Sequence, residues 1–201
     1  MKYICNLLTP DRRTGSQGAR SRDFVLKRMP RHAVCAEIGV YKGDFSARIL
    51  SIAKPRALHL IDPWKFEATD TYRDSLYGGD KGVDQARMDA IFESVHARFC
   101  DEMASERVCI HRASSAIASA IFPDQYFDWI YIDGNHLYEF VKGDLQMYWD
   151  KVKSGGYIAG DDYEEEGWWR GGVKRAVDEV IHSGGCTLVE LKRGQFVLRK
   201  S

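Results

Sequence analysis

The sequence lacks an excess of charge of either sign. Lys plus Arg and Asp plus Glu both number 29 in 201 residues, so the formal net charge is zero. A nucleic-acid partner is not expected, because proteins that neutralise phosphates usually carry a basic excess. Arg12, Arg13, Arg20 and Arg22 form one local basic run. A basic patch there stays open, but a solvated, partly mobile N-terminal segment is the favoured interpretation.

Long apolar runs and paired cysteines are also missing. No run approaches the ~18 apolar residues of a membrane helix, and the stretch 3–8 is too short for a signal peptide. No two of the five cysteines form a Cys-x-x-Cys pair, so neither a zinc site nor a redox motif is expected. Cys35 and Cys109 lie in apolar runs and are expected to be buried. These absences favour a cytoplasmic protein without a membrane partner.

From residue 33 onward, short apolar runs alternate with segments of helical periodicity. The expected strands span 33–38, 57–61, 108–110, 127–132, 157–159, 187–191 and 196–198, with a turn at Gly155-Gly156. The expected helices span 24–29, 44–53, 84–103, 114–122, 137–152 and 173–182. The pattern predicts an α/β fold with a Rossmann-like, doubly wound, mostly parallel seven-stranded sheet. A C-terminal antiparallel hairpin ends the sheet, and helices cover both of its faces. We expect residues 1–30 to form an N-terminal extension and residues 31–201 one domain.

The turn after the first expected strand indicates the class of cofactor. It reads Glu37-Ile38-Gly39-Val40-Tyr41-Lys42-Gly43. A dinucleotide fingerprint would place glycines at 39, 41 and 44, where this chain has Tyr41 and Asp44 in the last two positions. Tyr41 would obstruct a pyrophosphate and Asp44 would repel it. A cofactor without phosphates suits this turn better.

The acidic-x-Gly-x-x-x-Gly turn resembles the first motif of class I S-adenosylmethionine-dependent methyltransferases. The resemblance implies that Glu37, Gly39 and Gly43 contact the methionine portion of the cofactor, although a purely structural glycine turn remains an alternative. Tyr41, in the same turn, is also expected to bind the cofactor. It also implies that Asp62 binds the ribose hydroxyls, where a simple turn aspartate is the alternative. Ser114 and Asp133 complete the cofactor assignment, and Ser114 equally suits a helix N-cap.

Carboxylates follow the two strands that end at Asp133 and at Asp161-Asp162. Ligands of doubly wound sheets bind beyond the carboxyl ends of the strands. We expect these two strands to be neighbours, so that the three carboxylates converge and repel one another. A hard divalent cation would relieve the repulsion, and oxygen ligands favour magnesium, calcium or manganese.

The runs from Tyr131 to Glu139 and from Gly155 to Tyr163 resemble the small metal-dependent O-methyltransferases of the macrocin type, which modify sugars on natural products. The resemblance covers residues 33–199 and implies that Asp133, Asp161 and Asp162 hold magnesium, which binds two oxygens of a diol-like acceptor. It also implies that His136 removes the acceptor proton next to Asp133, because Asn135 stands where other members carry an Asp base. Alternatively, His136 only orients Asp133 or caps the following helix.

The sequence therefore predicts an S-adenosylmethionine-dependent methyltransferase that methylates a hydroxyl of a small molecule with the help of magnesium. The alternatives are a nicotinamide oxidoreductase on a similar sheet and a non-catalytic cofactor-binding domain. Two segments, 63–83 and 163–172, should cover the site, and Trp168 and Trp169 would stack on the acceptor or pack in the core. The sequence leaves a homo-oligomer open.

Overall fold

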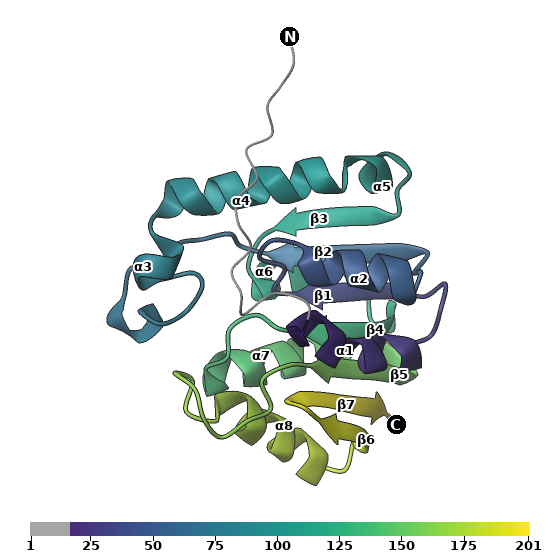
Figure 1. Cartoon of the computed structure of the whole chain (residues 1–201). Coiled ribbons are helices and arrows are strands. Elements are labelled where there is room, and N and C mark those ends of the chain that lie inside the picture. Colours follow the sequence, from purple (N-terminus) through teal and green to yellow (C-terminus); the bar gives the residue numbers. More distant parts are fainter. Residues whose placement is uncertain (1–16) are drawn as a thin grey trace.

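The structure, a computed structural model, describes residues 17–201 of the chain. In this part, seven strands form one sheet in the order β3-β2-β1-β4-β5-β7-β6 (Figure 1). The first five strands are parallel, and β7 and β6 form the antiparallel end. The strands are β1 (Val34–Ile38), β2 (Ala57–Asp62), β3 (Val108–Arg112), β4 (Phe127–Ile132), β5 (Val152–Gly160), β6 (Cys186–Lys192) and β7 (Gln195–Lys200). The predicted fold class is confirmed.

Helices cover both faces of the sheet, as expected for parallel strands that are apolar on both sides. They are α1 (Gln17–Arg28), α2 (Asp44–Ile52), η1 (Asp70–Tyr72), α3 (Gly79–Gly82), α4 (Gln85–Arg98), α5 (Cys100–Ala104), α6 (Ser115–Ser119), α7 (Tyr138–Trp149) and α8 (Gly172–His182). One core cluster joins α1, α2 and α4 to one sheet face. The other joins α6, α7 and α8 to the opposite face.

The predictions for residues 84–103 and for Gly155-Gly156 were wrong in detail. The helix expected over 84–103 is divided at Phe99 into α4 and α5. The turn expected at Gly155-Gly156 lies inside β5, where the pairing with β4 shifts register between Phe127 and Trp129. Gly155 has a φ of +75°, which a glycine adopts without strain. The glycine pair therefore forms an irregularity within a strand and not its beginning.

The described part of the N-terminal segment belongs to the same core. Helix α1 is longer than the predicted 24–29 and packs against α2. Val25, Leu26 and Met29 are almost completely buried in the cluster that also contains α2. This packing holds the polar side of α1 beside the end of β4, where Arg22 reaches Asp133.

Cysteine burial was predicted correctly at one position and wrongly at the other. Cys35 is buried on β1, whereas Cys109 is exposed because β3 is the edge of the sheet. Cys5 lies outside the described residues. Within residues 17–201, no helix combines the length and apolar character required to cross a membrane.

Candidate active site

A cavity of about 670 Å³ lies at the carboxyl ends of the central strands. Residues after β1 and β2 line one side of it, and residues after β4 and β5 line the other. Of the residues assigned from sequence, the lining includes Glu37, Gly39, Tyr41, Asp62, Ser114, Asp133, His136 and Asp162. This position is the ligand-binding edge of a doubly wound sheet.

The glycines of the first turn have structural reasons of their own. A Cβ at Gly39 would lie 2.1 Å from the backbone oxygen of Asp133, and φ of Gly39 is +91°. Gly43 precedes α2 in a left-handed conformation, and a Cβ there would collide with Phe99. Gly39 thus lets the end of β1 pass directly against the backbone after β4. That close approach brings the two sides of the cavity together.

Glu37 lines the cavity as a buried carboxylate, and within residues 17–201 one side chain, that of Ser46, donates a hydrogen bond to it. It is 1% exposed, and Ser46 Oγ donates to its Oε2 over 2.5 Å. Burial raises the pKa of Glu37 to about 8, although the hydrogen bond from Ser46 opposes this. A cationic ligand group would restore the charge on this carboxylate.

Both oxygens of the Asp62 carboxylate accept hydrogen bonds. Its Oδ2 accepts hydrogen bonds from the backbone nitrogens of Val40 (2.9 Å) and Tyr41 (3.0 Å), and its Oδ1 from that of Trp64 (2.7 Å). The hydroxyl of Tyr77 donates a further short hydrogen bond to Oδ2. Burial raises the pKa of Asp62, and these donors counteract the shift. The sequence placed Tyr77 in the covering segment 63–83 but did not indicate its hydrogen bond to Asp62, because a loop position has no periodic signal.

Ser114 is the N-cap of α6, and its side chain accepts a hydrogen bond from the backbone nitrogen of Ile117 over 3.3 Å. The capping interpretation of Ser114 is confirmed. The residue also lines the cavity, so its predicted cofactor contact stays a prediction.

Ligand-type atoms of Asp133, His136 and Asp162 lie within 4.8 Å of one another at the ends of the neighbouring strands β4 and β5. His136 Nε2 lies 2.6 Å from Asp162 Oδ2 and 3.5 Å from Asp133 Oδ1. Among the described residues, this buried nitrogen has no well-aligned hydrogen-bond partner. Asp162 has a φ of +58°, an uncommon conformation for a residue other than glycine.

The protonation of this cluster bears on the predicted roles. Burial alone would lower the pKa of His136, but Asp133 and Asp162 outweigh it and raise the pKa to about 10. His136 is therefore an imidazolium at neutral pH while no other cation is present. Burial would raise the pKa of Asp133, yet Arg22 and His136 hold it below its usual value.

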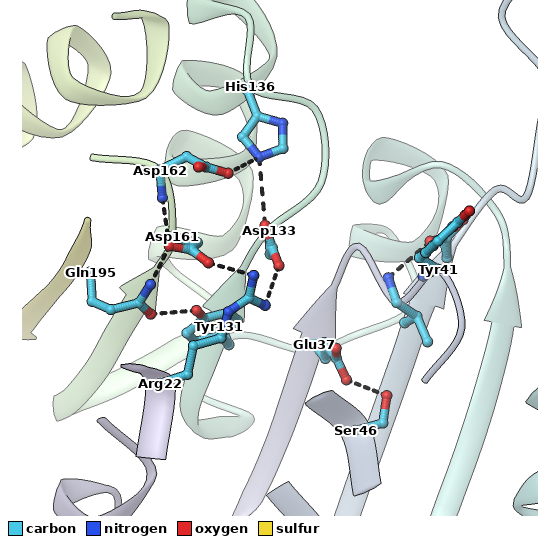
Figure 2. Close-up of polar contacts among 12 residues, drawn as sticks. Arg22, Glu37, Tyr41, Ser46, Tyr131, Asp133, His136, Asp161, Asp162 and Gln195 are labelled. Atoms are coloured by element: carbon cyan, nitrogen blue, oxygen red, sulfur yellow. Dashed lines mark hydrogen bonds and ion pairs between the residues drawn. The ribbon is translucent and has the colours of Figure 1, made fainter. Parts of the chain in front are cut away.

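Arg22, on α1, supplies the second positive charge of the site (Figure 2). Its guanidinium lies 2.6 Å from Asp133 Oδ2 and 2.5 Å from Asp161 Oδ2. It also lies over the ring of Phe45, 5.2 Å from the centroid. The expectation that Arg22 is solvated was wrong, because its side chain is only 24% exposed and is bound to two carboxylates.

Asp161 faces this arginine and not the cluster formed by Asp133, His136 and Asp162. Its Oδ1 accepts hydrogen bonds from the backbone nitrogen of Asp162 (2.9 Å) and from the side chain of Gln195. Gln195 in turn accepts a hydrogen bond from the hydroxyl of Tyr131 over 2.5 Å. Burial, reinforced by Asp133, raises the pKa of Asp161 to about 7, against the effect of Arg22. The three carboxylates therefore lie close together, as predicted, but only Asp133 and Asp162 share the cluster with His136, whereas Asp161 is bound by Arg22.

The two segments expected to cover the site do meet above it. Tyr72 and Trp168 are in edge contact, with ring centroids 5.7 Å apart. The ring of His136 lies 5.1 Å from that of Trp169. Asn135 donates a hydrogen bond to the hydroxyl of Tyr72 over 2.7 Å. Aromatic rings therefore enclose the acidic end of the cavity.

Comparisons with known proteins identify the family of the chain and confirm its fold. The sequence profile of a family described as a methyltransferase domain matches residues 36–163. An uncharacterised protein of Acanthamoeba polyphaga mimivirus is 41% identical over 67 residues, which cover 31% of this chain and 30% of the viral protein. The match therefore spans less than a third of that relative.

Two solved structures share the fold. The O-methyltransferase TomG from Streptomyces achromogenes, in complex with SAM, has 14% identity and a TM-score of 0.62, over 91% of this chain and 78% of TomG. An O-methyltransferase from Bacillus cereus, in complex with SAH, has 12% identity and a TM-score of 0.62, over 94% and 82% of the two chains. At these identities the likeness establishes the fold alone.

Proposed function

Since the chain belongs to the methyltransferase-domain family, we propose that it transfers the methyl group of S-adenosylmethionine to a hydroxyl oxygen of a small molecule. A sugar or another diol-like compound is the proposed acceptor. A divalent cation, magnesium in the first instance, assists the transfer.

One observation carries this proposal. A single cavity joins a glycine turn with two buried acidic residues, Glu37 and Asp62, to a second group of carboxylates around Asp133. Its volume lies within the usual range of small-molecule sites, about 300–1,000 Å³. A cofactor at the first end and an acceptor at the second would meet in the middle. Positioning the two reactants in this way supplies much of the acceleration in a direct transfer.

The chemistry of the first end suits S-adenosylmethionine. Glu37 is a buried carboxylate without a cationic partner among the described residues, and the ammonium group of the methionine portion would supply one. Asp62 is placed to accept hydrogen bonds from ribose hydroxyls once Tyr77 moves away. The bend suits a pyrophosphate poorly, because Tyr41 lines it and the carboxylate of Asp44 stands at the start of α2, where it would repel phosphate charge. The family match also contradicts the oxidoreductase alternative.

The residues at the second end fit a divalent cation. His136 Nε2 is buried between two carboxylates without an aligned hydrogen bond, as expected for a nitrogen that faces a cation. We assign Asp133, His136 and Asp162 as the residues that would hold it, while Asp161 is bound by Arg22. When bound, such a cation lowers the pKa of an acceptor hydroxyl. Carboxylate ligands suit magnesium and manganese alike, so manganese would compete with magnesium at this set.

This assignment has a consequence for the predicted base. A nitrogen that holds a cation has no lone pair left for a proton, so the ligand and base roles exclude one another at Nε2. Asp133 and Asp162 keep His136 protonated in the cation-free state. We therefore place His136 among the proposed ligands.

The proposal is tested by calorimetry and by activity. We expect S-adenosylhomocysteine to bind more tightly than NAD, and methyl transfer to sugars or catechols to be abolished by EDTA and restored by magnesium or manganese. Tighter binding of NAD would overturn the proposal. Binding of S-adenosylhomocysteine without any transfer would favour a non-catalytic domain.

His136→Gln distinguishes the two roles of the histidine. Manganese binding, followed by electron paramagnetic resonance, should weaken at least about tenfold if His136 is a ligand. Glu166→Gln, an exposed substitution in the covering segment, is the matched control and should bind manganese normally. Unchanged manganese affinity with lost activity would return His136 to the role of base.

A further inference from the structure

A second cluster of metal-ligating side chains lies outside the cavity, on the edge of the sheet. His59 is on β2, and Cys109 and His111 are on the edge strand β3. The parallel register pairs His59 with Cys109, and His111 follows Cys109 by two residues. All three side chains therefore point to the same face of the sheet.

The separations within this cluster suit a tetrahedral metal ion. His59 Nδ1 lies 3.0 Å from His111 Nε2, and the potential ligand atoms of all three residues lie within 4.8 Å of one another. Zinc–nitrogen bonds of about 2.0–2.1 Å place two nitrogens of a tetrahedron roughly 3.3 Å apart. Only a small adjustment of the two rings is therefore required.

The surroundings orient the ligands and leave the site accessible. The hydroxyl of Tyr126 lies 3.2 Å from Nε2 of His59, which leaves Nδ1 directed at His111. A hydrogen bond to the second ring nitrogen is the usual support of a histidine ligand. Phe122 packs edge-on against both imidazole rings, and Cys109 is exposed to solvent.

We propose that His59, Cys109 and His111 bind a zinc ion, with solvent at the fourth position. The Cys109 thiol loses its proton to solvent on binding, and the proton between the two imidazoles is displaced. A Cys-His-His set suits zinc better than magnesium or calcium. The sequence contains no sign of this site, since it has no Cys-x-x-Cys motif. The ligands come instead from two strands separated by about 50 residues of chain. None of the three residues lines the cavity described above, so the proposal is independent of the proposed function.

Cobalt(II) is the probe, because thiolate coordination produces charge-transfer absorption that oxygen ligands cannot. We expect one equivalent of cobalt to give this absorption together with the visible bands of a tetrahedral ion, and zinc to displace it. The cluster around Asp133 contains no sulfur and does not contribute to the charge-transfer signal. Absence of the signal would overturn the proposal and leave only the hydrogen-bonded chain of Tyr126, His59 and His111.

Substitutions identify which residues produce the cobalt absorption. Cys109→Ser should abolish it, while Cys100→Ser, which changes another exposed cysteine, should leave it intact. Tyr126→Phe should weaken cobalt affinity roughly tenfold through the lost support of His59. His111→Gln should shift the visible bands away from their tetrahedral form. A charge-transfer signal that survives Cys109→Ser would overturn the proposal.

Discussion

The guanidinium of Arg22 lies between Asp133 and Asp161 and forms an ion pair with each. Arg22 stands before residue 36, where the match to the family profile begins. The guanidinium of Arg22 therefore places a positive charge of the protein itself next to the carboxylates of Asp133, Asp161 and Asp162. Together with the protonated His136, Arg22 reduces the charge repulsion that a divalent cation would otherwise have to relieve.

Arg22→Met should therefore destabilise the protein and change its response to divalent cations. Removing one partner from a largely buried pair costs about 3 kcal/mol, so we expect a lower free energy of unfolding in the absence of metal. Magnesium or manganese should raise the unfolding temperature more in this variant than in the wild type, because it supplies the missing charge. Thermal unfolding with and without the cation measures both effects.

Arg22→Lys is the matched control, because it keeps the charge and loses the two-pronged geometry. Its stability should lie between those of the wild type and Arg22→Met. Equal stability of all three proteins would contradict a role for Arg22 in neutralising Asp133 and Asp161.

Glu37→Gln should change the pH dependence of stability. The pKa of Glu37 is raised from 4.5 to about 8 in the folded protein, so the folded state keeps a proton that the unfolded state releases. This contribution is fully present below about pH 4.5 and is lost as the pH rises to about 8. The variant lacks this titration, so its free energy of unfolding should fall less between pH 5 and pH 8 in urea titrations. Parallel pH profiles would show that Glu37 does not titrate in this range.

The raised pKa of Glu37 also predicts a proton release when the cofactor binds. If the ammonium group of S-adenosylhomocysteine binds Glu37, the carboxyl ionises and releases a proton on binding. Calorimetry at pH 7 in buffers of different ionisation enthalpy should detect this proton in the wild type and not in Glu37→Gln. Binding without proton release in the wild type would place the ammonium elsewhere.

Gly39→Ala should destabilise the protein much more than an alanine at an open glycine. At Gly39 the new Cβ would lie 2.1 Å from the Asp133 backbone oxygen, so the end of β4 has to move. Gly184 has a φ of +79° and nothing within 4 Å, so Gly184→Ala reports the backbone strain alone, about 1–2 kcal/mol. Urea unfolding should give a clearly larger loss for Gly39→Ala, and similar losses would contradict the close approach of the two turns.

The fold was predictable because its strands are short apolar runs buried on both faces, which few other arrangements allow. The adjacency of β4 and β5 followed from the same reasoning and placed Asp133 near Asp162. The contact between Gln195 and Asp161 could also have been predicted from the sequence. The antiparallel register pairs Gly160 with Phe196, so the preceding residue of β7 lies across from Asp161.

Arg22 could not be found in this way. Its position depends on how α1 packs against α2 and the sheet, and no local pattern encodes that orientation. The exposure of Cys109 depends in the same way on which strand forms the edge of the sheet. The orientation of Asp161 follows from its partners Arg22 and Gln195, which belong to distant segments.

Tyr77→Phe tests whether Asp62 binds the ribose of the cofactor. The Tyr77 hydroxyl occupies Asp62 Oδ2, beside the backbone nitrogens of Val40 and Tyr41. Ribose hydroxyls would have to replace it, so removing the competing hydroxyl should tighten S-adenosylhomocysteine binding. A hydrogen bond to a charged group contributes about 1.5–3 kcal/mol, which sets an upper limit of about a hundredfold. Tyr157→Phe, on β5 and outside the cavity lining, should leave the affinity unchanged in calorimetry. Weaker binding by Tyr77→Phe would mean that this hydroxyl contacts the cofactor, and Asp62 would then be a residue that only holds the turn in place.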